Sequence, residues 1–196
     1  MDSILEPLMA SPQMPELLAE LNRAAEDEAV RRKQFYRDIT PNDKWEFING
    51  EVIAQSPATL KHTEIGRRLA QLINTFDFVE QLRGKTLQEK ALIALTRNDY
   101  EPDINYFSRD KATQFTDDQW KFPAPDFIVE ILSKSTKHRD RGIKYDDYAK
   151  HGVAEYWIVD PNAETVEQYF IGANGEYDLN VNCLLYTSDA ADEWLR

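Results

Sequence analysis

The chain has 196 residues and a formal net charge of −12, with 42% hydrophobic and 11% aromatic residues. This composition indicates one globular domain and excludes a disordered chain. The acidic balance argues against a protein that coats nucleic acid non-specifically, although a local basic patch can still bind DNA. No apolar run reaches the length of a membrane-spanning helix, and the N-terminus lacks the basic start of a signal peptide. We therefore expect a cytoplasmic protein that does not enter a membrane.

The first forty residues predict a helical extension, residues 1–39. Residues 15–36 contain good helix formers, no glycine and charges of both signs, and their apolar stripe fades after the first half. The stretch WEFINGEVIAQSP, residues 45–57, predicts a hairpin around Asn49-Gly50. Residues 60–78 place five apolar side chains on one face of a helix.

The remaining chain alternates predicted strands with one predicted basic helix. Strands are expected at 91–95, 101–107, 126–132 and 155–161, a helix at roughly 137–151 that ends at Gly152, and a last hairpin around Asn174-Gly175. This order favours an α/β or α+β domain over residues 40–182, built on a mixed sheet.

The C-terminal stretch CLLYTSDAADE, residues 183–193, differs in character from the rest of the chain. It resembles the translation of a transposase adaptor used in sequencing libraries, and a polar C-terminal helix is the alternative. On the first interpretation residues 183–196 are a non-native tail, the natural chain continues past Asn182, and the single cysteine, Cys183, is not native.

Two acidic residues interrupt an apolar strand in PDFIVEILSKST, residues 125–136. Asp126 and Glu130 project from the same face, because side chains alternate along a strand. Burying either as an anion is costly unless a cation or hydrogen-bond donors meet it. If the strand EPDINYF, residues 101–107, lies alongside, Asp103 meets Glu130, and such a carboxylate pair suits Mg²⁺ or Mn²⁺. An ion of this kind polarises a phosphoryl oxygen and activates a bound water.

The predicted basic helix lies next to these carboxylates. Residues 134–150 hold six Lys or Arg against three Asp. Positions 137, 141, 144, 148 and 151 share one helical face, so Arg141, Lys144 and Tyr148 are expected to turn toward the site together. Lys144 is the candidate for a catalytic lysine that offsets charge on the phosphate.

The segment PDFIVEILSKSTKHRDRGIKYDDYAKHGVAEYWIVDP, with WEFINGEVIAQSPATLKH and EPDI upstream, resembles the Uma-two family of restriction endonucleases. The resemblance covers roughly residues 40 to 180. It implies the PD-(D/E)xK nuclease fold, a mixed central sheet flanked by helices, with metal-dependent phosphodiesterase activity. Asp103 and Glu130 match the acidic residues of that motif. Leu132 occupies the position of the usual lysine, and the resemblance implies that Lys144 replaces it from the helix.

Five further residues are second-tier candidates, each with a structural alternative. Glu46 is a possible third carboxylate on the polar face of its strand, and His62 matches a family histidine but can also cap a helix. Asp126 can mark only a turn, Arg141 can form a buried ion pair with Glu130, and Tyr148 can belong to the core. Lys144 itself can pair with the aspartate four residues before it.

Three functions are compatible with this sequence. The first is a homodimeric, Mg²⁺-dependent DNA endonuclease, since duplex symmetry favours a two-fold enzyme. The second is an inactive module of the same fold that binds nucleic acid or protein, which the broken motif at Leu132 favours. The third is a domain that only oligomerises through the 15–36 helix, which leaves Glu130 unexplained.

Overall fold

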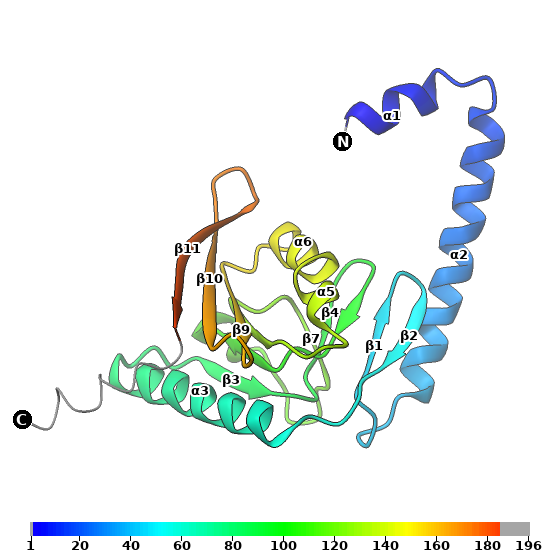
Figure 1. Ribbon diagram of the computed structural model, residues 1–196. Helices are drawn as coiled ribbons and strands as arrows, with labels where there is room; N and C mark the ends of the chain where they lie inside the picture. The colour runs from blue at the N-terminus through cyan, green and yellow to red at the C-terminus, as the bar shows by residue number, and fades with distance from the viewer. Residues whose placement is uncertain (1, 185–196) are drawn as a thin grey trace, which may run out of the picture.

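The computed structural model describes residues 2–184 (Figure 1). Its helices are α1 Asp2–Met9, α2 Met14–Asp38, α3 Leu60–Val79, α4 Arg109–Ala112, α5 Lys137–Asp140 and α6 Ile143–Lys150. Its strands are β1 Trp45–Ile48, β2 Glu51–Ala54, β3 Lys85–Gln88, β4 Leu92–Ala94, β5 Asp99–Tyr100, β6 Ile104–Phe107, β7 Lys121–Phe122, β8 Phe127–Ile131, β9 Glu155–Asp160, β10 Thr165–Ile171 and β11 Tyr177–Leu184. Within the described range, no helix is both long and apolar enough to cross a membrane.

The strands form two mixed sheets. The larger has the order β11-β10-β9-β8-β6-β3, and its β8–β9 pair is parallel while its other pairs are antiparallel. The smaller has the order β2-β1-β5-β4-β7, with the β4–β7 pair parallel. The mixed α+β fold predicted from the sequence is therefore confirmed, with two sheets where one central sheet was expected.

Helices cover both faces of the larger sheet, and strand β8 shows why. Val129 and Ile131 pack with α3, where Ala70 is buried. Ile128, on the opposite face of the strand, packs with the buried Tyr148 of α6. Glu130 shares the face of Ile128, so its carboxylate enters a layer that is otherwise apolar and aromatic.

Helix α2 belongs to the domain only through its C-terminal part. Phe35 is buried against Phe47 and Leu92. Arg32 bonds both oxygens of the buried Asp99, at 2.7 and 2.8 Å. Figure 1 shows the N-terminal half of α2 extending past the sheets, with α1 turning back from its end.

Most predicted elements are present, and two of them need correction. The strand expected at 101–107 begins only at Ile104, because the chain bends at Asp103, just after Pro102. The helix expected at 137–151 is two helices, because the backbone of Gly142 leaves the helical region at φ −123° and ψ −106°. Helices α1 and α4 and strands β3, β5 and β7 were not predicted individually. Of the expected adaptor-derived tail, two residues continue β11, and residues 185–196 lie outside the described part.

Candidate active site

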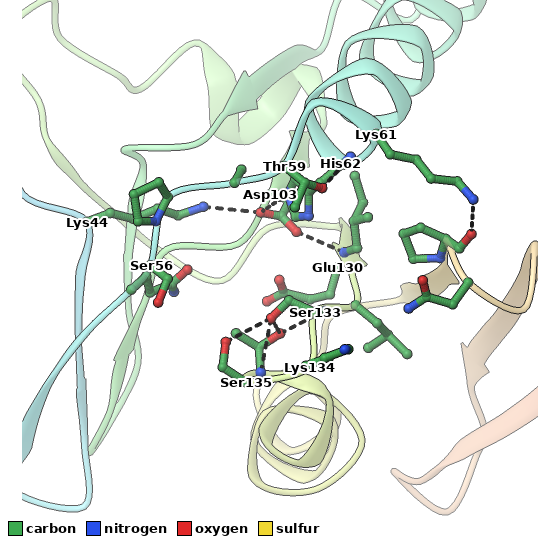
Figure 2. Close-up of a pocket in the computed structure, with 18 of the residues that line it drawn as sticks. Lys44, Ser56, Thr59, Lys61, His62, Asp103, Glu130, Ser133, Lys134 and Ser135 are labelled. Atoms are coloured by element: carbon green, nitrogen blue, oxygen red, sulfur yellow. Dashed lines mark hydrogen bonds and ion pairs between the residues drawn. The ribbon is translucent and has the colours of Figure 1, made fainter.

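A cavity of about 430 Å³ opens where the start of β6 and the end of β8, in the larger sheet, meet the loop before α3. Its walls come from the start of α3, the bend before β6, the end of β8 and the loop that follows β8 (Figure 2). The charged residues that line it are Lys44, Lys61, His62, Asp103, Glu130, Lys134 and Lys144.

Asp103 and Glu130, the two carboxylates predicted from the sequence as metal ligands, lie side by side at this cavity. Strands β6 and β8 are antiparallel neighbours in which Ile104 pairs with Val129, so Asp103, one residue before, comes opposite Glu130. The backbone N–H of Ile131 donates to Asp103 Oδ2 at 2.8 Å, which fixes this carboxylate against β8. The expected juxtaposition of the two strands is therefore confirmed.

Two side chains hold Asp103. Lys44 Nζ and His62 Nε2 each lie 3.2 Å from Asp103 Oδ1. Burial raises the pKa of Asp103, but the His62 hydrogen bond, the Lys44 charge and the Ile131 N–H lower it to about 2. Asp103 is therefore an anion at neutral pH. His62 is placed in the first turn of α3, whose N-terminus Thr59 caps by accepting from the His62 N–H.

Glu130 is more deeply buried than Asp103, and its pKa is shifted in the opposite direction. Its Oε1 accepts from Lys144 Nζ at 2.9 Å and from the Tyr148 hydroxyl at 3.0 Å. Burial raises the pKa of Glu130 to about 8; the nearby carboxylates of Asp140, Asp103 and Glu46 also raise it, against the Lys144 charge. Negative charge at this position is therefore incompletely balanced.

Lys144 is surrounded by carboxylates. Its Nζ is 2.8 Å from Glu46, 2.9 Å from Glu130 and 3.2 Å from Asp140, and the side chain is only 1% exposed. Although burial lowers the pKa of Lys144, the three carboxylates raise it well above its ordinary value. One ammonium thus faces three carboxylates, which leaves an excess of negative charge beside Asp103.

These residues fit a divalent cation held by two carboxylates rather than a closed cage. Within residues 2–184, no group of three or more His, Cys, Asp or Glu side chains is arranged to hold a metal ion. Mg²⁺ commonly binds through one or two carboxylates and keeps several waters. Oε2 of the buried Glu46 has no hydrogen-bond partner, a further sign of uncompensated negative charge.

The second-tier candidates divide into two groups. Glu46, His62 and Tyr148 contact the residues of the site. Asp126 lies elsewhere, where it binds Lys111 at 2.8 Å and the backbone N–H of Ser108 at 2.7 Å.

Arg141 also lies away from the site. It forms a two-bond pair with Glu167, because the break at Gly142 removes it from the helical face of Lys144. The predicted common face of residues 137–151 is therefore wrong for Arg141 and right for Lys144 and Tyr148, which both lie in α6.

No feature of the sequence pointed to one residue of the site, Lys44, which contacts Asp103. Lys44 directly precedes β1, is 59 positions from Asp103 in the sequence, and still contacts it. An isolated lysine next to a hairpin carries no signal of this kind, because only the pairing of β1 with β5 brings it near the bend before β6. Lys44 is also more exposed than Lys144, at 19% against 1%.

A model of a protein family described as "Putative restriction endonuclease", Uma2, matches residues 32–186. Two uncharacterized proteins of Synechocystis sp. are similar in sequence. One, slr1290, is 29% identical, with 69% of this chain and 70% of that protein covered. The other, sll1609, is 27% identical, with 68% and 75% covered.

A solved structure from Anabaena variabilis, titled a "putative nuclease belonging to DUF820", matches the fold. It has a TM-score of 0.65 and 22% identity, and covers 82% of this chain and 90% of its own. At this identity the likeness establishes the common fold.

Proposed function

Because the chain belongs to the Uma2 family of restriction endonucleases, we propose that it is an endonuclease that hydrolyses DNA phosphodiester bonds with the help of Mg²⁺ or Mn²⁺. The observation that carries the proposal is the pair of Asp103 and Glu130 on neighbouring strands at one cavity. Asp103, with a pKa of about 2, offers a divalent cation an ionised ligand, while Glu130, whose pKa is raised to about 8, would release its proton when the cation binds.

The roles of the residues follow from their contacts. Asp103 and Glu130 would hold the ion, which when bound polarises the phosphate and lowers the pKa of a water. Lys144 and Tyr148, both in α6, donate to the Glu130 carboxylate and orient it, so they are positioning residues. His62 and the Ile131 N–H fix the orientation of Asp103.

Lys144, expected from the sequence to be the catalytic lysine, is enclosed by three carboxylates, so the lysine proposed to act on the substrate is Lys44. Its ammonium lines the cavity beside Asp103, where it can pair with a phosphate oxygen and stabilise the charge that develops during water attack. Lys61 and Lys134 at the same cavity supply further contacts for the DNA backbone. The local positive charge needed to bind DNA is thus present on an acidic protein.

A second function, nucleic-acid binding without cleavage, is favoured by one observation. The Glu130 oxygen that contacts Lys144 also accepts from Tyr148, so a cation must share this carboxylate with two protein donors. A protein of this kind would bind DNA in a salt-dependent manner and leave it intact.

Calorimetric titration with Mn²⁺, a DNA-binding assay at several salt concentrations and a plasmid-cleavage assay test the proposal on the full chain, after circular dichroism confirms folding. The variants are Asp103→Asn, which keeps an acceptor for Ile131, and Asp126→Asn, a matched control because Asp126 lies outside the cavity. We expect Mn²⁺ binding and cleavage in the wild type and Asp126→Asn, and neither in Asp103→Asn. DNA binding without Mn²⁺ binding or cleavage would instead support the second function, and the absence of all three would exclude both.

A further inference from the structure

Helix α3 covers only part of its face of the larger sheet. Among the described residues, α3 is the only helix in the core on this face, where Leu69, Ala70 and Ile73 pack with the strands. Helices α5 and α6 lie on the other side of the sheet (Figure 1). Six strands about 4.8 Å apart span about 24 Å, whereas a helix is about 10 Å across, so one helix leaves roughly half of the face without a covering layer.

The uncovered part of this face forms an apolar groove beside α3. Its cavity, of about 660 Å³, lies between α3 and strands β8, β9 and β10. On the sheet side, Trp157 of β9 pairs with Gln168 of β10, and two residues along the same strands Glu155 pairs with Phe170. Phe127 of β8 lies on the other side of Glu155. Each of the three strands therefore contributes one aromatic side chain to the groove.

The wall of the groove on α3 has the spacing of a helix–helix contact. Leu69, Leu72, Ile73 and Phe76 follow the i, i+3, i+4, i+7 pattern. Leu72 and Phe76 remain 65% and 61% exposed, although they lie beside the aromatic side chains of the sheet. Large apolar side chains exposed side by side mark a surface that a partner covers. A second helix laid along α3 would bury both side chains and cover the open strands.

The charge of the groove indicates what the second helix carries. Asp126 and Glu155 are the charged residues that line it, and both are acidic. Asp126 is paired with Lys111 at 2.8 Å. Glu155 Oε1 accepts from Trp157 and Gln168, each at 2.6 Å, and within residues 2–184 no cationic side chain forms an ion pair with it. A partner with a cation beside an apolar stripe complements this surface, whereas the phosphates of DNA do not.

We propose that this groove binds an amphipathic helix of another protein. The apolar stripe of that helix packs against Leu72 and Phe76, and a Lys or Arg at its edge pairs with Glu155. The site is separate from the catalytic cavity, which adjoins Lys61 and His62 in the first turn of α3, about two turns before the groove begins. Binding at the groove therefore leaves the catalytic cavity open and does not depend on the proposed nuclease activity.

Fluorescence anisotropy with synthetic peptides tests the groove on the full chain. The probe is a labelled amphipathic peptide of about four helical turns, with leucines on one face and lysines on the other. Its control has the same composition, with the leucines spread around the helix. We expect the chain to bind the probe at least about 10-fold more tightly than this control. A third peptide, with glutamate in place of every lysine, should bind at least about 10-fold more weakly than the probe.

One pair of variants tests the apolar wall. Leu72→Gln with Phe76→Gln removes it at two exposed positions and should weaken binding of the probe at least about 10-fold. Leu60→Gln with Phe78→Gln is the matched control, because these side chains are also exposed apolar residues of α3 but do not line the groove. We expect the control to bind as the wild type does. Near-UV circular dichroism checks that each variant is folded.

A second pair of variants tests the charge. Glu155→Gln keeps an acceptor for Trp157 and removes the negative charge, and Asp146→Asn removes the same charge from an exposed position outside the groove. We expect the first variant to weaken binding of the probe about 3-fold and to reduce its salt dependence, and the second to change neither.

Three results would overturn the proposal. The first is equal affinity for the probe and the peptide of the same composition, which would mean that charge alone attracts them to an acidic protein. The second is unchanged affinity in Leu72→Gln with Phe76→Gln, which would place binding on another surface. The third is self-association of the wild type in sedimentation equilibrium that the same variant abolishes, which would assign the groove to a second copy of this chain.

Discussion

Replacing Lys144 with methionine tests the electrostatics of the site most directly. The substitution keeps most of the side-chain volume and removes the one ammonium that lies within 3.2 Å of three carboxylates. Removing one partner of a buried ion pair costs about 3–5 kcal/mol, and three uncompensated carboxylates place Lys144→Met toward the upper end. In a domain of this size each kcal/mol changes the Tm by about 2–4 °C, so we expect a decrease of roughly 10–20 °C.

The pH dependence of stability predicts at which pH Lys144→Met is more destabilising. Because the folded pKa of Glu130, about 8, lies above its ordinary value of 4.5, the folded state holds a proton that the unfolded state has released between these pH values. Stability linked to Glu130 is therefore greatest at low pH and falls as pH rises toward 8. Loss of the Lys144 charge raises the Glu130 pKa further. The destabilisation by Lys144→Met should accordingly be smaller at pH 5.5 than at pH 8.5.

Urea unfolding followed by circular dichroism at these two pH values measures both effects. Lys150→Met is the matched control, because Lys150 lies in the same helix and is exposed, and we expect a change within about 0.5 kcal/mol. A Lys144→Met variant that loses less than 1 kcal/mol at pH 8.5, or equally at both pH values, would refute the reasoning that this ammonium balances the buried carboxylates.

Three further substitutions test contacts that stabilise the fold. Arg32→Ala leaves the buried Asp99 without its two-bond partner and should cost about 3–5 kcal/mol in urea unfolding; a cost below 1 kcal/mol would mean that α2 is not held by this pair. Tyr148→Phe removes a donor to Glu130 and should cost about 1–2 kcal/mol in the same assay, so unchanged stability would mean that this hydrogen bond does not stabilise the fold. Gly84→Ala brings a Cβ to 2.6 Å from a backbone carbonyl oxygen and should lower the Tm by an amount equivalent to about 1–3 kcal/mol in a thermal melt, whereas an unchanged Tm would show that the loop yields freely.

Local signals in the sequence predicted the elements that build the site. Asn49-Gly50 marks the β1–β2 turn, with φ 51° and 84° at its two central residues. The alternation of FIVEI placed Glu130 on one face of β8, and the expected pairing of the segment EPDINYF with this strand predicted that Asp103 would meet it. These signals are reliable because a glycine turn and a two-residue period act within a few residues.

Contacts set by tertiary packing could not be predicted in this way. Lys44 reaches Asp103 across 59 residues of sequence, and no pattern near Lys44 distinguishes it from a solvated lysine. The balance of one ammonium against three carboxylates depends likewise on strands and helices that meet only in the folded chain. The type of residue is readable in the sequence, whereas its partner is a property of the packing.

The two helices that flank Gly142, α5 and α6, show where helical periodicity in the sequence no longer predicts which side chains share a face. Counting from 137 to 151 puts Arg141 on the face of Lys144 only if the helix is continuous. A Cβ at position 142 would lie 2.8 Å from the carbonyl oxygen of His138, so the chain needs glycine to turn there. Lys144 and Tyr148 both follow the turn and keep their four-residue relation, and both reach Glu130. Arg141 precedes it and binds Glu167 instead. A glycine inside a predicted amphipathic helix therefore divides its residues into two sets, and only positions within one set can be assigned to a common site.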